Sequence, residues 1–306
     1  MRPPLTRPAD FDAFWTSTLD TLASVPLDCR LGTATRAPEH RRLIPARFRS
    51  FGDAEIQGYF LSADESELDH TPGPRPLVVT THGYGSQSNP ALEARHVQQL
   101  DLFCFDVRGY GLSRPGCAVD PRGYVLTGLL DPSTSLLRGA VCDFVRAAQV
   151  AQHVQNLAGS PIAFCGRSFG GALAFIAQAI SGLANFLAVS VPTLGWAMGR
   201  RQLAMRGSSA EINDYVARVP ADEAAVMRTL SYFDTVNFAD RVTCPALVGV
   251  GRRDDIVPAE TVYAIINHMS PPPEVIELPV SHSVEHDEAM WQGFDRRWTS
   301  VVRGLV

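Results

Sequence analysis

Short, uninterrupted apolar runs alternate along the chain with longer segments in which apolar residues recur every three or four positions. The uninterrupted runs are typical of strands buried on both faces of a parallel sheet, and the periodic segments are typical of helices that cover such a sheet. The apolar runs occupy residues 76–81, 102–107, 161–165, 185–192, 245–251 and 274–280. Helical spacing appears at 8–25, 135–156, 171–177 and 262–268. The alternation predicts an α/β fold with a mostly parallel central sheet and helices on both faces.

A different pattern precedes the first buried run. Apolar and polar residues alternate from Leu43 to Ser62, and Gly52-Asp53 separates the two halves. Alternation around a short turn predicts an antiparallel hairpin, which we place at the edge of the sheet. The polar segment from Ala63 to Arg75 then predicts a loop.

The chain has 306 residues, of which 45% are hydrophobic and 19% charged. This composition is that of a globular protein with a large core, and we expect a single domain over 1–306. Two segments depart from the alternation of strands and helices. Residues 193–236 are rich in helical pattern and predict an insertion that caps a site, whereas residues 117–132 predict a long loop at an oligomer interface or at the rim of a pocket.

Charge and cysteine spacing exclude several classes of function. The formal net charge is −5 and basic residues form no long run, which argues against a nucleic-acid partner and favours a small neutral or polar substrate. No window reaches the apolar length of a membrane span, and the first residues lack the apolar core of a signal peptide, so we expect a soluble, cytoplasmic protein without a membrane partner. The six cysteines are scattered without zinc-site spacing, which predicts free thiols and no metal site.

A candidate nucleophile lies in the sequence GRSFGG at residues 166–171. The apolar run before it and the helical spacing after it predict a strand, a tight turn and a helix. A serine at such a turn adopts strained backbone angles, and the flanking Gly166 and Gly170 avoid collisions with the neighbouring strand and helix. We therefore expect Ser168 to present its hydroxyl to a base.

A serine hydroxyl needs an imidazole to accept its proton, and the last strand ends near such a group. His282 follows the apolar run 274–280 by two residues and is the predicted base. His286 lies a further turn along the chain, and His82 follows an earlier strand. Surface or core roles are the ordinary explanation for a single histidine, and the position after the last strand favours His282.

The acid that orients the imidazole is expected after the strand 245–251. Asp254 and Asp255 both follow it, and periodicity does not separate adjacent residues in a loop. Asp254 is favoured because Asp255 opens the next turn, where one of the two could cap the following helix. Asp106 and Asp240 are weaker candidates. The chain order Ser, Asp, His is that of the α/β-hydrolase triad.

The oxyanion of a tetrahedral intermediate needs fixed N–H donors. The residue after the nucleophile, Phe169, supplies one through its backbone. The loop HGYG at 82–85 follows another strand, and the backbone N–H of Tyr84 is the candidate for the second donor, although its glycines would equally suit a simple tight turn. Tyr84 and Pro192, the latter at the end of the run 185–192, are also candidate substrate contacts. Arg108, with its neighbours Asp106 and Tyr110, is expected to brace loops.

Several longer stretches resemble the acetyl xylan esterase / cephalosporin C deacetylase family, carbohydrate esterase family 7. They include DFDAFW, DVRGYG, LLDPSTSLLRGAVCDFVRA, GRSFGG, RTLSYFDTVNFADRV and GRRDDIVP, and the likeness runs almost end to end. The resemblance implies an α/β-hydrolase fold, Ser168, Asp254 and His282 as the triad, and the Tyr84 and Phe169 amides as the oxyanion hole. It also implies a homo-oligomer, a hexamer built from dimers. Tyr110, Phe169 and Ser283 replace signature residues of the family, and the first two make their surroundings bulkier and more apolar.

Together these observations predict a serine esterase that hydrolyses small acyl esters, acetyl esters above all, through an acyl-enzyme. Acetylated xylo-oligosaccharides are one implied substrate class. No cofactor is implied. The alternatives are a general carboxylesterase, thioesterase or peptidase of the same fold, and a binding protein that keeps the fold without turnover.

Overall fold

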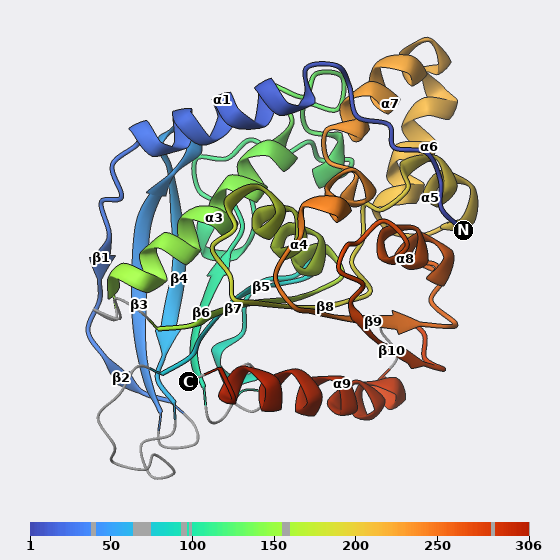
Figure 1. Ribbon diagram of the computed structural model, residues 1–306. Helices are drawn as coiled ribbons and strands as arrows, with labels where there is room; N and C mark the ends of the chain where they lie inside the picture. Colours follow the sequence, from blue (N-terminus) through green and yellow to red (C-terminus); the bar gives the residue numbers. More distant parts are fainter. Residues whose placement is uncertain are drawn as a thin grey trace.

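A twisted, mostly parallel sheet forms the centre of the protein, as the computed structural model shows (Figure 1). The structure describes residues 1–37, 41–63, 75–92, 97, 100–154, 160–282 and 285–305, with only the backbone described at 154 and 285–288. Within these residues the strands are β1 (Arg30–Leu31), β2 (Thr35–Arg36), β3 (Arg42–Ser50), β4 (Ala54–Leu61), β5 (Leu77–Thr81), β6 (Asp101–Asp106), β7 (Ile162–Arg167), β8 (Phe186–Ser190), β9 (Ala246–Gly251) and β10 (Glu274–Leu278). Their order is β1-β3-β4-β6-β5-β7-β8-β9-β10, and β2 also pairs with β3.

The sheet has a parallel part and an antiparallel part. Strands β6, β5, β7, β8, β9 and β10 are parallel to one another. Strand β4 pairs antiparallel with β6, and β3 and β1 continue the sheet with antiparallel pairing. The five residues of β5 and the five of β8 are all buried, which accounts for their uninterrupted apolar sequence. The predicted α/β class, with a mostly parallel sheet, is confirmed.

The predicted hairpin is present, because β3 and β4 pair in antiparallel register around a short turn at 51–53. Its predicted place at the sheet edge is wrong. The short strands β1 and β2 lie outside it, where Arg30 pairs with Arg47 and Thr35 with Leu43. Strands of two residues are too short to show an alternating pattern, so periodicity does not predict them. Most of the polar segment after the hairpin lies outside the described residues.

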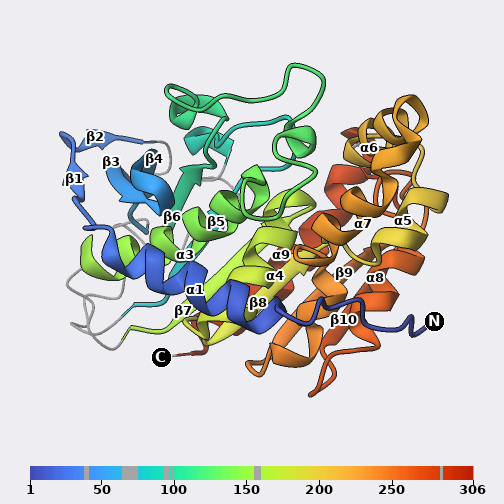
Figure 2. The same cartoon turned by 90° about the horizontal axis from the view of Figure 1, so that it is seen from above.

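Helices cover both faces of the sheet (Figure 1, Figure 2). On one face lie α3 (Leu136–Val154), α4 (Phe169–Ser181) and α8 (Ala259–Ile266), and α1 (Phe11–Ser24) runs across the outer side of α3. The long α9 (Glu285–Arg303) covers the other face and was not predicted. Its buried Trp291, Phe294 and Trp298 belong to the main apolar core.

The segment between β8 and β9 forms the predicted helical insertion. It contains α5 (Ala197–Leu203), α6 (Ser208–Arg218) and α7 (Glu223–Ser231), with the short turns η4 (Pro220–Asp222) and η5 (Thr235–Arg241). The three α-helices gather at one end of the molecule (Figure 2). A second apolar cluster joins them to the 117–132 loop and its turn η3 (Tyr124–Leu126); its members are Val125, Leu126, Leu129, Ile212, Val216, Val226 and Leu230. The two segments that depart from the α/β pattern therefore pack against each other.

Helix α1 ties the start of the chain to the end of this insertion. The indole Nε1 of Trp15 donates a hydrogen bond of 3.1 Å to the carbonyl of Tyr232, and Phe14 packs on the Tyr232 ring with centroids 4.7 Å apart. Asp10 occupies the predicted N-cap position, but its carboxylate accepts a hydrogen bond from the Tyr232 hydroxyl and makes no side-chain cap. Asp10 therefore connects the start of α1 to the end of the insertion and does not cap the helix with its side chain.

Candidate active site

The turn between β7 and α4 holds Ser168 in a strained conformation. Its φ of 54° and ψ of −115° are rarely adopted by a residue with a side chain. A Cβ at Gly170 would lie 2.5 Å from the carbonyl oxygen of Thr81, and one at Gly166 would collide with the backbone of Gly170. The close approach of β5, β7 and α4 therefore requires both glycines, as the sequence predicted.

Ser168 opens on a cavity of about 1180 Å³ that includes the carboxyl end of the parallel strands and extends to Val78 of β5 and Trp298 of α9. The cavity is lined by residues that follow different strands, among them His82, Tyr84, Ser168, Thr193 and His282. Loops diverge at this edge of an open α/β sheet, which is why ligand sites form there. The fold thus brings the candidate nucleophile and the candidate base to one cavity.

Asp254 and His282 form a hydrogen-bonded pair, and His282 lines the same cavity as Ser168. The His282 Nδ1 lies 2.7 Å from Asp254 Oδ2, and the side chain of Asp254 is fully buried. The other carboxylate oxygen accepts the backbone N–H groups of Ile256 at 2.9 Å and Val257 at 2.7 Å. One oxygen of Asp254 therefore binds the imidazole, and the other binds the backbone of the turn that follows Asp254. These bonds to the turn fix the direction of the carboxylate.

Asp255, the alternative acid, points away from this pair. It is exposed and binds Arg206, with Oδ2 2.9 Å from Nη1, and the hydrogen bond from this guanidinium lowers its pKa. The weaker candidates are also engaged elsewhere. Asp106 accepts the N–H groups of Ser88 and Leu112, and Asp240 pairs with Arg7. Of the four carboxylates considered, Asp254 is the one that contacts His282.

His82, an alternative base, lines the same cavity but uses both ring nitrogens. Nε2 accepts the N–H of Val107 at 3.2 Å, so the proton is on Nδ1, which donates to the carbonyl of Gly83 at 2.8 Å. Burial lowers the pKa of His82 and keeps the ring neutral. The side chain of His286 lies outside the described residues, and so does Ser283.

Arg167, which the sequence analysis passed over, connects the nucleophile turn to the histidine loop. Its Nη2 donates a hydrogen bond of 3.1 Å to the backbone carbonyl of His282. Its guanidinium also lies over the Trp291 ring of α9, 4.7 Å from the centroid. The only sequence signal was its place next to Ser168. These contacts make Arg167 a positioning residue for the loop that carries His282.

The two candidate oxyanion donors follow the neighbouring strands β5 and β7. Phe169 is the first residue of α4, so no earlier turn of that helix can accept its N–H. Tyr84 follows β5 and lines the cavity. The side chain of Phe169 is fully buried and packs edge-on against the Tyr84 ring, with centroids 5.6 Å apart. Tyr110 and Tyr124 complete this aromatic cluster at 6.5 and 5.7 Å from Phe169.

Pro192, the other candidate substrate contact, is buried in the turn after β8 and is not among the residues that line the cavity. Its neighbours Ser190 and Thr193 line it instead. The carbonyl of Ser190 accepts the N–H of Ser168 at 3.0 Å, and Thr193 donates its N–H to the carbonyl of Ser168 at 3.2 Å. This turn therefore holds the backbone of the candidate nucleophile.

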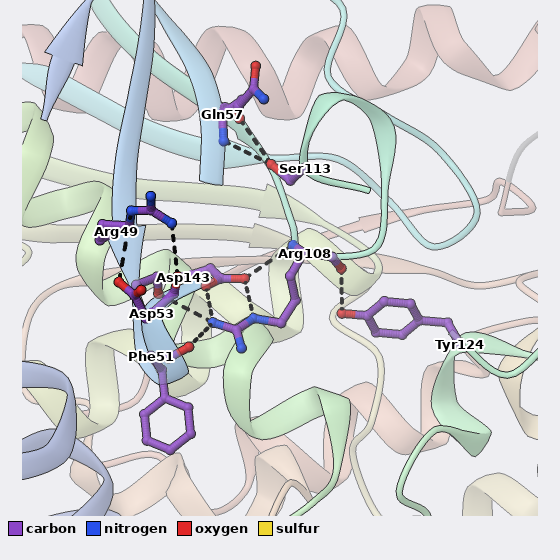
Figure 3. Close-up of polar contacts among 9 residues, drawn as sticks. Arg49, Phe51, Asp53, Gln57, Arg108, Ser113, Tyr124 and Asp143 are labelled. Atoms are coloured by element: carbon purple, nitrogen blue, oxygen red, sulfur yellow. Dashed lines mark hydrogen bonds and ion pairs between the residues drawn. The ribbon is translucent and has the colours of Figure 1, made fainter. Parts of the chain in front are cut away.

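Arg108 forms a largely buried brace between several segments of the chain (Figure 3). Its Nε and Nη2 contact the two carboxylate oxygens of Asp143 at 2.9 and 2.7 Å, and its backbone N–H also reaches Asp143. The guanidinium further donates to the carbonyl of Phe51, and the Tyr124 hydroxyl donates to the carbonyl of Arg108. This agrees with the bracing role predicted for Arg108.

Comparisons with a protein family, with another protein sequence and with solved structures agree with one another. A family model described as acetyl xylan esterase (AXE1) matches residues 1–294. The acetyl esterase Axe7A of Xylanibacter ruminicola is 22% identical over 314 residues, which cover 99% of this chain and 68% of that protein. Among solved structures, an acetyl xylan esterase from Paenibacillus sp. R4 has a TM-score of 0.85 with 26% identity and covers 96% of both chains.

Acetyl xylan esterase 1 from Thermoanaerobacterium sp. JW/SL YS485 has a TM-score of 0.79 with 22% identity, covering 97% of this chain and 99% of that one. At this identity the likeness supports the fold, which is that of the α/β-hydrolases. No helix in the described ranges is long and apolar enough to cross a membrane.

Proposed function

The chain belongs to the acetyl xylan esterase family and is a carboxylic ester hydrolase, and from this premise we propose that it removes acetyl groups from small esters through an acyl-enzyme on Ser168. Asp254 and His282 complete the proposed triad, and the backbone N–H groups of Tyr84 and Phe169 form the proposed oxyanion hole. The observation that carries the proposal is the buried Asp254–His282 pair at the cavity of Ser168.

In the proposed first step, Ser168 Oγ attacks the carbonyl carbon of the acetyl ester while Nε2 of His282 accepts the hydroxyl proton. The bond formed is Oγ–C, and the carbonyl oxygen becomes an oxyanion that accepts the N–H groups of Tyr84 and Phe169. The imidazolium then gives its proton to the alcohol oxygen, the C–O bond breaks, and the alcohol leaves.

In the second step a water molecule attacks the acyl-enzyme carbonyl, and His282 accepts one of its protons. Collapse of this second intermediate breaks the Oγ–C bond, returns a proton to Ser168 and releases acetate. Asp254 stays ionised throughout, holds the proton of His282 on Nδ1 and stabilises the imidazolium. The Nδ1–Oδ2 distance of 2.7 Å suits this role.

Replacing the nucleophile tests the proposal directly. We expect Ser168→Ala to lower kcat for p-nitrophenyl acetate by about a thousandfold or more, because no covalent intermediate can form. A fluorophosphonate probe should label the parent protein and leave the variant unlabelled. Ser86→Ala is the matched control, since Ser86 lines the same cavity and its hydroxyl contacts the carbonyl of Gln87. An undiminished rate in Ser168→Ala would refute the proposal.

The natural ester is proposed from the relatives, whose names specify acetyl esters and acetyl xylan. A cavity of about 1180 Å³ is large enough for a sugar as well as an acetyl group. A panel of p-nitrophenyl esters from acetate to octanoate, with acetylated xylo-oligosaccharides and an anilide, should show the highest kcat/KM for acetyl esters. A preference for long acyl chains or for the anilide would instead favour a general carboxylesterase or a peptidase.

The homo-oligomer and the cytoplasmic location implied earlier stay predictions. Exposed apolar side chains on and after α5, namely Met198, Leu203 and Met205, are compatible with a subunit contact. Light scattering separates the 33.3 kDa monomer from a dimer or hexamer.

A further inference from the structure

The hydroxyl of Tyr84 joins three segments that are distant in sequence. It donates a hydrogen bond to Glu211 Oε2 in α6, with the oxygens 2.5 Å apart. It accepts the backbone N–H of Val125, in the 117–132 loop, at 3.1 Å. The proposed mechanism uses the backbone of Tyr84, so these contacts of its side chain need a separate explanation.

Glu211 is placed for this contact and not for contact with substrate. Its side chain is half-buried between α6 and the 117–132 loop, and it is not among the residues that line the cavity. A side chain at Gly123 would collide with its carboxylate, so glycine at that position gives Glu211 the room to reach Tyr84. The geometry thus directs the carboxylate toward the tyrosine.

The electrostatic surroundings favour a strong hydrogen bond. Desolvation raises the pKa of the Tyr84 hydroxyl, and the hydrogen bond to Glu211 raises it further, so the hydroxyl remains a donor. Desolvation also raises the pKa of Glu211, while the hydrogen bond from Tyr84 and the nearby Arg200 act in the opposite direction. A hydroxyl that donates to a carboxylate in a partly desolvated place is held more firmly than a neutral pair.

The ring of Tyr84 also contacts the other proposed donor residue. It lies edge-on to Phe169 at 5.6 Å and to Tyr124 at 6.1 Å, with Tyr110 at 6.3 Å. Phe169 is fully buried at the start of α4, so the surrounding core holds its side chain in place. A shift of the loop that carries Tyr84 would therefore change the distance between the two backbone N–H groups.

We propose that Glu211 is a positioning residue for the oxyanion hole: by holding the Tyr84 hydroxyl, it fixes the loop after β5 so that the Tyr84 N–H meets the developing oxyanion. The inference rests on the proposed function. Its consequence is that the helical insertion contributes to the chemical step through α6, without contacting the substrate.

Variants of both partners test the contact. Tyr84→Phe removes the hydroxyl and keeps the ring and the backbone N–H, while Glu211→Ala removes the acceptor and Glu211→Gln keeps an amide oxygen that can accept. Because loss of a whole oxyanion donor costs about 10²- to 10³-fold in kcat, we expect a misplaced donor to cost about tenfold in Tyr84→Phe and Glu211→Ala. KM for p-nitrophenyl acetate should change less than twofold, and Glu211→Gln should keep most of the activity.

A tetrahedral analogue gives a readout that a purely structural role would not change. Methylboronic acid forms a tetrahedral adduct with a serine hydroxyl, so its inhibition constant should rise by the same factor by which kcat falls. The double variant Tyr84→Phe/Glu211→Ala should be no worse than either single variant, because both remove one contact. Asp214→Asn, at an exposed position of the same helix, is the control and should behave like the parent.

Unchanged kcat and boronate inhibition in Tyr84→Phe and Glu211→Ala would overturn the inference and leave the contact a structural one. If Glu211→Ala does not fold, Tyr84→Phe still decides the matter. Failure of the proposed function is a different result, because then Ser168→Ala would keep the parent activity.

Discussion

Two histidines lie on one cavity, and their surroundings differ in one respect. His82 follows β5 and His282 follows β10, and both rings are largely buried. Both nitrogens of His82 are occupied, one by the carbonyl of Gly83 and one by the N–H of Val107. His282 is bonded by Asp254 at Nδ1, and among the described residues its Nε2 has no hydrogen-bond partner.

The number of bonded ring nitrogens indicates whether a histidine can exchange a proton or only supports the structure. One bonded nitrogen fixes the tautomer and the orientation of an imidazole, and the second nitrogen is then available to exchange a proton. In His82 both nitrogens are bonded, and a proton on Nε2 would face the N–H of Val107, which is also a donor. The ring therefore stays neutral and connects β5 to the loop after β6. Burial alone therefore does not distinguish the two histidines, whereas the number of hydrogen-bonded ring nitrogens does, and it favours His282 as the proposed base.

The largest effect should come from breaking the support of His282. Asp254→Asn keeps the shape of the side chain and replaces an acceptor with an amide, so we expect kcat for p-nitrophenyl acetate to fall about 10⁴-fold because the imidazole adopts the wrong tautomer. Asp255→Asn is the matched control and should change kcat less than twofold. Equal losses in the two variants would show that the triad acid is misassigned.

The next largest effect should be on stability, from the ion pair between Arg108 and Asp143. Arg108→Met leaves Asp143 as a buried charge without its ion-pair partner and should lower the free energy of unfolding by about 3–5 kcal/mol, measured by urea denaturation. The control is Arg49→Met, since the 3.8 Å pair of Arg49 with the exposed Asp53 should contribute less than about 1 kcal/mol (Figure 3). The kcat per folded molecule should stay close to that of the parent, and a thousandfold loss would contradict a bracing role.

His82 itself should couple stability to pH. Desolvation lowers its folded-state pKa below the unfolded value of about 6.5, so its contribution to stability is complete above that pH and is lost as the pH falls toward the folded pKa. His82→Leu should remove this acid sensitivity. It should also cost about 1–3 kcal/mol at pH 8, because the N–H of Val107 loses its acceptor. Urea denaturation from pH 5 to 8 checks both, and an unchanged acid slope in the variant would assign the sensitivity to other groups.

The smallest effect should come from the outer support of His282. Arg167→Lys keeps the charge but loses the planar group that stacks on Trp291 and donates to the His282 carbonyl, so we expect kcat to fall about tenfold through a displaced imidazole. Arg252→Lys is the control, because Arg252 pairs with Glu277 at the surface. A parent-like kcat in Arg167→Lys would show that the loop holds His282 without this contact.

The pattern of apolar residues predicted those parts of the site that lie within one short stretch of the sequence. The strand, turn and helix around Ser168 lie within about twenty consecutive residues, and the order of the later strands pointed to Asp254 and His282. Helix α9 was not predicted, although the spacing of Trp291, Phe294 and Trp298 is that of one helix face and would have indicated it. The choice between Asp254 and Asp255 depends on which carboxylate turns inward, and no periodicity reports this.

Contacts between distant segments had no signal at all. Tyr84 and Glu211 are 127 positions apart, and Arg167 meets the carbonyl of a residue 115 positions later. The departures at Tyr110 and Phe169 were visible as single unusual residues, but their meeting with Tyr84 and Tyr124 in one aromatic cluster depends on the folded chain. Prediction from sequence thus named the proposed reacting groups, two of which the structure brings to one cavity, but not the residues that hold them.

The bond from Trp15 to the carbonyl of Tyr232 has a consequence for synthesis of the protein on the ribosome. The two residues are 217 positions apart, and at about 5–20 residues per second the ribosome takes roughly 10–40 s to cover that distance. For this time the apolar face of α1, with Phe11, Phe14 and Trp15, waits without its partners Tyr232, Phe233 and Phe238. Helix α1 is therefore among the last helices to gain all of its contacts, and a nascent chain halted before residue 232 lacks them.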